Sequence, residues 1–170
     1  MSDAKLVARN DPSEETRMEV EVVKRPALHL ASVRHVGSYM LVKEAFRRLN
    51  DIVTAAGLSN RDTLLVGIYH DDPSSTPEDK LRADAAITVA PNTKLPNGLT
   101  ELDIPAGRYA HAVHHGPYDG LGRLWNHLRN EWLPKSGEKA GDGMSYEVYR
   151  NTPMNAQPND LVTDIYLPLK

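Results

Sequence analysis

The segment SYEVYR, residues 145–150, places a glutamate two positions before a tyrosine. Its alternating pattern predicts a strand, and residues two apart in a strand point to one face, so Glu147 and Tyr149 are expected side by side. A carboxylate on an aromatic wall suits a lipophilic cation, because charge pairing and cation–π contacts reinforce each other where water is excluded. Glu147 could instead lie at the solvent edge or pair with Arg150 or Arg108. The binding interpretation depends on whether other aromatic residues gather on the same face.

Strand parity extends this predicted aromatic face. The segment LVGIYH puts Gly67 and Tyr69 on one side, and similar reasoning in the other strands predicts a common face with Tyr69, Asp84, Glu147, Tyr149, Asp164 and Tyr166. The opposite, helix-covered face is predicted to carry Val66, Ile68, Ile87, Val89, Val148, Ile165, Leu167 and Leu169. The candidate ligand-binding residues are Glu147, Tyr149, Tyr69, Tyr39, Tyr118, Tyr166 and Trp132. Each tyrosine taken alone also fits a core or rim position, and Trp132 could reach either core or cleft.

Metal and nucleophilic chemistry find little support in the sequence. The segment HAVHH gathers His111, His114 and His115, but on a strand His111 and His115 share a face that His114 does not, which suits one metal ion poorly. The chain has no cysteine, no G-x-S-x-G segment and no glycine-rich phosphate loop. We therefore expect no metal, no cofactor and no catalytic nucleophile. The remaining enzymatic alternative is Glu147 as a general acid or base, assisted by a tyrosine hydroxyl.

These residues belong to a unit that the chain contains twice. At an offset of about eighty residues, the aligned pairs include Gly37 with Gly116, Tyr39 with Tyr118, Phe46 with Trp125, Tyr69 with Tyr149 and Asp84 with Asp164. The first repeat spans residues 18–92 and the second 99–170. Glu147 departs from this symmetry, because its counterpart in the first repeat is Gly67. Glycine leaves room there, and glutamate supplies charge.

Each repeat has the pattern β-α-β-β. A first strand alternates apolar and polar residues, bends at Pro26-Ala27 or Pro105-Ala106, and continues as a second extended piece. An amphipathic helix and two further strands follow, and Pro134 is expected to stop the second helix. Trp125 lies on the helix stripe and is predicted to pack in the core. His35 and His114 precede the two glycine turns at equivalent positions, which favours a structural role.

One helix covers only one face of each small sheet, so the other face must find cover. We predict an α+β fold, a duplicated β-α-β-β unit with pseudo-two-fold symmetry, in which two antiparallel sheets flanked by helices surround a central ligand cleft.

Composition restricts the classes of partner. The 170 residues carry a formal net charge of −3, with 25% charged and 40% hydrophobic residues, which is ordinary for a soluble globular protein and too nearly neutral to suggest direct nucleic-acid binding. Residues 1–17 are polar and are interpreted as a flexible arm without signal-peptide character. No helix-turn-helix pattern precedes the repeats, and no apolar run is long enough for a membrane span. A cytoplasmic location is expected.

Several segments in order resemble the DNA gyrase inhibitor (GyrI-like) family, which shares its domain with the effector-binding module of AraC-type and MerR-type drug-responsive regulators. They are RHVGSY, GIYHDDPSSTPEDKLRADAAI, HHGPYDGLGRLWNHLRNEWLPKSG and YEVYRNTP, and the resemblance covers about residues 18–170. It implies a central cleft for hydrophobic, often cationic, small molecules. It also implies that Glu147 matches the family's buried cleft glutamate and that Tyr39, Tyr69, Tyr118, Tyr149 and Tyr166 form the aromatic wall.

Three functions follow from these observations. A stand-alone binding protein for drug-like or toxin-like molecules, acting by sequestration or effector sensing, is favoured over an enzyme. The first alternative, which the resemblance implies, is a hydrolase of cyclopropane-bearing or other electrophilic toxins that uses the cleft glutamate. The second is contact with DNA gyrase through protein surfaces. In the binding protein, Glu147 is expected to accept hydrogen bonds from tyrosine hydroxyls when the cleft is empty and to have a raised pKa.

Overall fold

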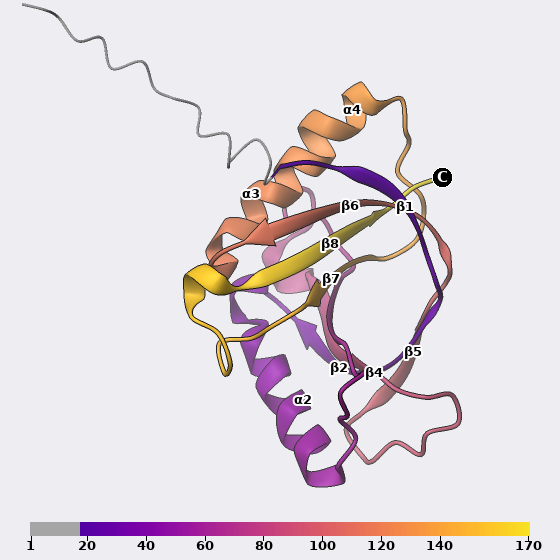
Figure 1. The fold of residues 1–170 in the computed structure, drawn as a ribbon, viewed down its shortest axis with the longest axis vertical. Helices are drawn as coiled ribbons and strands as arrows, with labels where there is room; N and C mark the ends of the chain where they lie inside the picture. Colours follow the sequence, from indigo (N-terminus) through magenta and orange to yellow (C-terminus); the bar gives the residue numbers. More distant parts are fainter. Residues whose placement is uncertain (1–17) are drawn as a thin grey trace, which may run out of the picture.

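The computed structural model describes residues 18–170, so the predicted arm at residues 1–17 lies outside the described residues. The chain forms an α+β fold around one curled sheet of eight antiparallel strands (Figure 1), which confirms the predicted fold class. The strands are β1 (Glu21–Arg25), β2 (Leu28–Val36), β3 (Leu65–Tyr69), β4 (Arg82–Thr88), β5 (Thr100–Ile104), β6 (Gly107–His115), β7 (Ser145–Tyr149) and β8 (Val162–Pro168). Their order is β1-β6-β8-β7-β3-β4-β2-β5, so the two expected sheets are joined through β3 and β7.

Each repeat contributes one helical segment. The first is α2 (Lys43–Ala56), and the second runs without interruption through α3 (Leu121–Asn126), the π-helical turn η4 (His127–Trp132) and α4 (Leu133–Ser136). Short 3₁₀ turns are η1 (Tyr39–Leu41), η2 (Glu78–Lys80), η3 (Tyr118–Gly120) and η5 (Pro158–Asp160). The prediction that Pro134 ends the second helix was wrong. The wider π-helical turn directly before Pro134 relaxes the backbone where its missing N–H and bulky ring disturb an α-helix.

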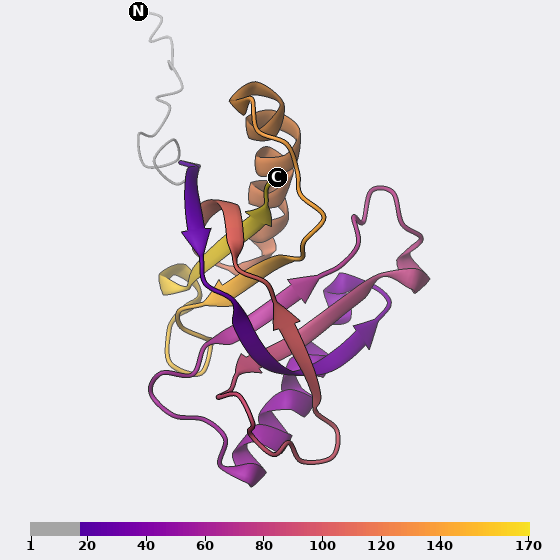
Figure 2. The ribbon, with the colours of Figure 1, turned by 90° about the vertical axis from the view of Figure 1, so that its right-hand side faces the viewer.

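The two Pro-Ala bends hold the curl of the sheet. Arg25 pairs with Gly107 and Leu28 pairs with Ile104, so β1–β2 and β5–β6 form one long antiparallel ribbon whose register continues across both bends. This confirms the predicted bent strands. Proline cannot donate to the ladder, and the ribbon turns where the two bends face each other. Figure 2 shows β1 continuing past the bend into β2. As a result, β1 of the first repeat pairs with β6 of the second, and β5 of the second pairs with β2 of the first.

Three apolar clusters stabilise this arrangement. One lies inside the curl and takes residues from all eight strands, among them Leu30, Val66, Ile68, Tyr109, Tyr146, Val148 and Tyr166. A second lies between α2 and the sheet around Leu49 and Ile87, and a third lies under α3 and α4 around Leu128 and Ile165.

The inner cluster corrects the predicted faces. Val66, Ile68 and Val148 lie inside the curl and not under the helices. Ile87 and Ile165 do lie under the helices, as predicted. Within each strand, the alternation of residues between the two faces was predicted correctly. The faces of neighbouring strands were matched wrongly, because Ile87 pairs with Leu65 and not with Val66. Both faces of this sheet are covered, so hydrophobicity alone does not reveal which residues share a side. No helix within residues 18–170 is both long and apolar enough to cross a membrane.

Candidate functional site

The two repeats meet where β3 pairs with β7, and there Gly67 lies directly opposite Glu147. These two positions correspond in the repeat, so the pseudo-two-fold axis passes between them. A Cβ atom at Gly67 would overlap the hydroxyl of Tyr149 and lie 3.2 Å from Cε2 of Tyr69. Gly67 therefore leaves the space that the side chains around Glu147 occupy.

The carboxylate of Glu147 is buried, with 4% of the residue exposed, on the side of the sheet that faces the helices. The indole Nε1 of Trp125 in α3 donates to Oε1 at 2.7 Å. The hydroxyl of Tyr149 donates to Oε2 at 2.6 Å, and a hydrogen bond of 3.1 Å joins the hydroxyls of Tyr149 and Tyr69. Burial raises the pKa of Glu147, and the hydrogen bonds from Tyr149, Trp125 and Tyr69 limit that rise. The expected hydrogen bond from a tyrosine hydroxyl is confirmed.

Aromatic rings from both repeats enclose this acid. Tyr39 packs edge-on against Tyr69 with ring centroids 5.0 Å apart. Tyr118 and Phe46 pack in the same way against Tyr149, at 5.6 and 5.5 Å. Burial and the nearby charge of Glu147 raise the pKa of Tyr69 and Tyr149 well above 10, so both keep their protons at neutral pH. The site thus combines one carboxylate, two phenol donors and an apolar wall.

The repeated phrase His-x-Gly-x-Tyr positions two of these tyrosines. His35 Nε2 donates to the carbonyl of Ser38 at 2.8 Å, and His114 Nε2 donates to the carbonyl of Pro117 at 2.7 Å. Between them the glycines have φ of +119° and +117°, a backbone conformation that favours glycine. The structural role expected for both histidines is confirmed. Each hydrogen-bonded turn places its tyrosine, Tyr39 or Tyr118, at the start of a helix.

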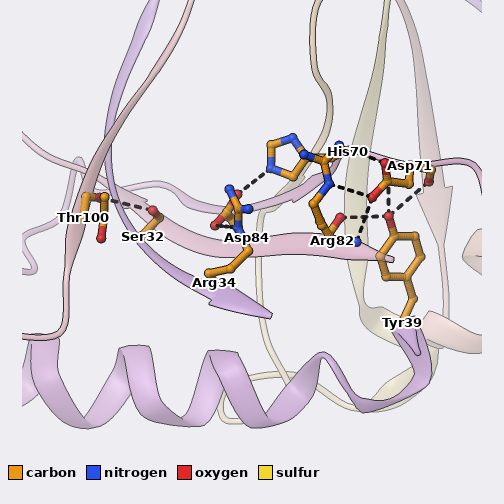
Figure 3. Close-up of polar contacts among 8 residues, drawn as sticks. All are labelled: Ser32, Arg34, Tyr39, His70, Asp71, Arg82, Asp84 and Thr100. Atoms are coloured by element: carbon orange, nitrogen blue, oxygen red, sulfur yellow. Dashed lines mark hydrogen bonds and ion pairs between the residues drawn. The ribbon is translucent and has the colours of Figure 1, made fainter. Parts of the chain in front are cut away.

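Tyr39 is further held by the loop after β3, as Figure 3 shows. Its hydroxyl lies 2.8 Å from the carbonyl of Arg82 and accepts from the N–H of Asp71 at 3.1 Å. The carboxylate of Asp71 in turn accepts two hydrogen bonds from the guanidinium of Arg82. The first-repeat rim of the site is therefore fixed to the end of the sheet.

A groove of about 410 Å³ opens beside this cluster. Tyr69 lines it from β3, Ser145 from β7 and Arg129 from η4, together with the acidic residues Asp71, Asp72 and Asp142. Tyr69 hydrogen-bonds Tyr149, which in turn hydrogen-bonds Glu147, so the groove borders the hydrogen-bonded chain at Tyr69.

The structure brings together five of the seven candidate residues, namely Glu147, Tyr149, Tyr69, Tyr39 and Tyr118. Trp132 packs against the apolar cluster under α3 and α4. Tyr166 lies inside the curl, where it stacks on Tyr146 at 4.8 Å and below the guanidinium of Arg25 at 4.4 Å. The prediction that Tyr166 shares a face with Glu147 was wrong for the register reason given above.

Asp84 and Asp164 are also on the inner face and not beside Glu147. Asp84 pairs with Arg34 and His70 (Figure 3), whereas Asp164 pairs with Arg150 and His111. Each buried carboxylate thus has one arginine and one histidine as partners. Each set of ion pairs around Asp84 or Asp164, called a clamp below, joins neighbouring strands. Glu147 is thus the carboxylate of the aromatic site.

Trp125 packs against the apolar cluster under α3 and α4, as predicted, but its hydrogen bond to Glu147 was not predicted. The sequence held a signal for it. The pairs Phe46/Trp125 and Gly67/Glu147 are both departures from the repeat symmetry, and in the structure the added indole N–H and the added carboxylate meet. Two further residues border the cluster but were not among the predicted site residues, namely Phe46 and Arg129.

Chemically, the arrangement suits recognition of an apolar group with a positive charge, because the carboxylate is desolvated and the walls are aromatic. A proton held on Glu147 could also be transferred. Within residues 18–170, no group of three His, Asp or Glu side chains could hold a metal ion.

Comparisons with known proteins identify the family and the fold. Residues 18–170 match the GyrI-like small molecule binding domain. A protein called DNA gyrase inhibitor from Yersinia enterocolitica is 33% identical over 141 residues, covering 79% of this chain and 87% of the relative. The EcmrR C-terminal domain has a TM-score of 0.76 at 21% identity and covers 89% of this chain and 97% of that domain. SAV2435 bound to tetraphenylphosphonium has a TM-score of 0.66 at 11% identity, covering 89% and 94%. This chain belongs to the GyrI-like small molecule binding domain family.

Proposed function

We propose that this protein binds lipophilic cations between its two helical segments, with the ligand's aromatic or aliphatic groups against the tyrosines and its charge matched by Glu147. The observation that carries the proposal is the burial of one carboxylate among Tyr69, Tyr149, Phe46 and Trp125. The structural likeness to SAV2435, whose solved structure holds the lipophilic cation tetraphenylphosphonium, supports this class of ligand.

Binding requires side chains at the site to move. Trp125 and Tyr149 now satisfy the two oxygens of Glu147, so a ligand must displace at least one of these side chains to approach the carboxylate. The hydrogen-bonded groups act as a temporary substitute for the ligand's charge, because burying an ionised carboxylate without partners costs several kcal/mol even after the protein relaxes around it. The groove lined by Tyr69 is the entry side in this proposal, because Tyr69 hydrogen-bonds Tyr149.

The test compares two ions of the same shape and opposite charge. Calorimetric titration with these ions, tetraphenylphosphonium and tetraphenylborate, and with the neutral triphenylphosphine oxide, in the wild type and in Glu147→Gln, separates charge matching from apolar contact. Losing a charged partner is worth about 1.5–3 kcal/mol, so Glu147→Gln should weaken phosphonium binding by roughly 10- to 100-fold. The neutral triphenylphosphine oxide should change by less than about 2-fold.

Glu101→Gln is the matched control, because Glu101 is an exposed acid on β5 whose loss changes the net charge equally. Equal losses for the cation and the neutral probe in Glu147→Gln would contradict the proposal. Mass spectrometry of cyclopropane-bearing and other electrophilic compounds after prolonged incubation with the protein distinguishes binding from the hydrolytic alternative, since a binding protein should leave each compound intact.

A second candidate function follows from the relatives called DNA gyrase inhibitor, which match most of this chain. If gyrase is a partner of this protein, purified protein should slow supercoiling of relaxed plasmid by gyrase without binding the plasmid itself. Unchanged supercoiling at a large molar excess of the protein over gyrase would exclude this function.

A further inference from the structure

One cation already lies beside the aromatic site. The guanidinium carbon of Arg129 lies 5.0 Å from the ring centroid of Trp125. Arg129 is only partly exposed, and its one hydrogen bond is a long one of 3.4 Å to the hydroxyl of Ser145. Across residues 18–170 it has no carboxylate within ion-pair distance, unlike Arg34, Arg82 and Arg150. Its guanidinium is therefore held mainly by the indole.

The same indole serves the buried acid. Trp125 donates its N–H to Glu147 while its ring carries Arg129, so a cation, an aromatic ring and a carboxylate lie in sequence. A bound lipophilic cation would need the same aromatic ring, that of Trp125, and the same carboxylate, that of Glu147. The geometry points to Arg129 as a specificity-determining residue that occupies the cation position on Trp125 and must leave when a cationic ligand enters. This inference rests on the proposed function.

The helix places Arg129 for this role. Arg129 follows Trp125 by four residues, so the two side chains are neighbours along the helix. It lies in the π-helical turn η4, whereas α2 of the first repeat is a regular helix with Asn50 at the equivalent position. The first repeat also has Phe46 in place of Trp125. The cation on the helix is thus specific to the half of the site that holds Glu147.

The groove can receive Arg129 once it is displaced. Asp72 and Asp142 line the same groove as Arg129. Neither makes an ion pair with an arginine or lysine among the described residues. A guanidinium released from Trp125 can therefore move outward toward these acids without entering an uncharged environment.

The consequence is a selectivity that depends on Arg129. A cationic ligand must replace an existing cation–π contact and approach a like charge, whereas an anionic ligand of the same shape meets an attractive charge. Removing the guanidinium should strengthen binding of the cation by about 3- to 30-fold, the range expected for one cation–π contact. It should weaken binding of the anion or leave it unchanged.

The test is calorimetric titration of Arg129→Gln with tetraphenylphosphonium and tetraphenylborate. We expect tighter binding of the cation and no gain for the anion, and Arg129→Lys, which keeps the charge but loses the planar stacking, should fall between Gln and the wild type. Arg123→Gln is the control, since Arg123 is exposed on α3 and forms no hydrogen bond or ion pair among the described residues. Melting curves of each variant verify that it is folded.

The outcomes separate the two proposals. Cation binding that is unchanged or weaker in Arg129→Gln, while the wild type binds the cation through Glu147, would overturn the role of Arg129 alone. An equal gain in Arg123→Gln would show a general charge effect and would also overturn it. A wild type that binds neither ion would refute both the proposed function and this inference.

Discussion

The main effect of replacing Gly67 by alanine should fall on the surroundings of Glu147 in the neighbouring strand, and not on the backbone at position 67. The added methyl group would overlap the hydroxyl of Tyr149 and lie 3.2 to 3.3 Å from ring carbons of Tyr69 and Tyr149. Tyr149 cannot simply retreat, because Phe46 and Tyr118 pack against its ring. The substitution therefore pushes the hydroxyl away from Glu147.

The expected cost has three contributions. Overpacking a buried site costs about 1–3 kcal/mol. Loss of the hydrogen bond from Tyr149 to the carboxylate of Glu147 costs about 1.5–3 kcal/mol, less whatever the phenol recovers elsewhere. Alanine in a strand gains about 0.5–1 kcal/mol over glycine. The unfolding free energy of Gly67→Ala should thus fall by about 2–4 kcal/mol.

Urea denaturation followed by circular dichroism measures this change, and a double-mutant cycle assigns it. In a Tyr149→Phe background the hydroxyl is absent, so adding the methyl group should cost at least about 1 kcal/mol less than in the wild type. Gly122→Ala is the control, because Gly122 is exposed in α3 and no atom lies within 4 Å of the added Cβ. It should stabilise the protein by up to about 1 kcal/mol.

The result that would refute the reasoning is a small effect. If Gly67→Ala changes the unfolding free energy by less than about 0.5 kcal/mol, the methyl group has been accommodated without displacing Tyr149. Equal costs of Gly67→Ala with and without the Tyr149 hydroxyl would show that the clash acts elsewhere.

Two further predictions concern protonation. Burial acts to raise the pKa of Asp164, but hydrogen bonds from His111 and Arg150 outweigh this effect and lower the pKa from 3.8 to about 2. The lowered pKa contributes about 2 kcal/mol to the free energy of unfolding. This contribution is fully present above pH 3.8 and is lost as the pH falls through about 2. Asp164→Asn should therefore lose stability against the wild type in urea at pH 7 and lose less near pH 2.5, and a pH-independent difference would count against the clamp. Trp125→Phe removes a donor to Glu147, so the pKa of that acid should rise and the midpoint of phosphonium binding against pH should move upward, whereas Trp132→Phe should leave the midpoint in place.

The repeat pattern predicted much of the fold because it relies on features that survive in sequence. The glycine turns, the Pro-Ala bends and the helix stripes each depend on a few residues whose chemistry is local. The joining of the two halves through β3 and β7 was not predictable in the same way. It depends on which strand edges meet, and no single residue in either strand specifies its partner.

The site was predicted in part for a similar reason. Glu147, Tyr149 and Tyr69 follow from spacing within single strands, and Tyr39 and Tyr118 follow from the repeated turn. Tyr166 was assigned to the wrong side because its relation to Glu147 depends on the register of β7 against β8. Arg129 escaped notice because the π-helical turn that surrounds it has no clear pattern in sequence.

Because Gly67 pairs with Glu147 across the pseudo-two-fold axis, this site could not be built from two identical half-molecules. In a homodimer of one such half, both residues at the axis would be the same. Two glutamates would face each other and repel, so that one would hold a proton. Two glycines would leave an opening with no charge. Only two halves that have diverged in sequence, as the two repeats of this chain have, can place a lone acid and the space it needs on opposite sides of one dyad.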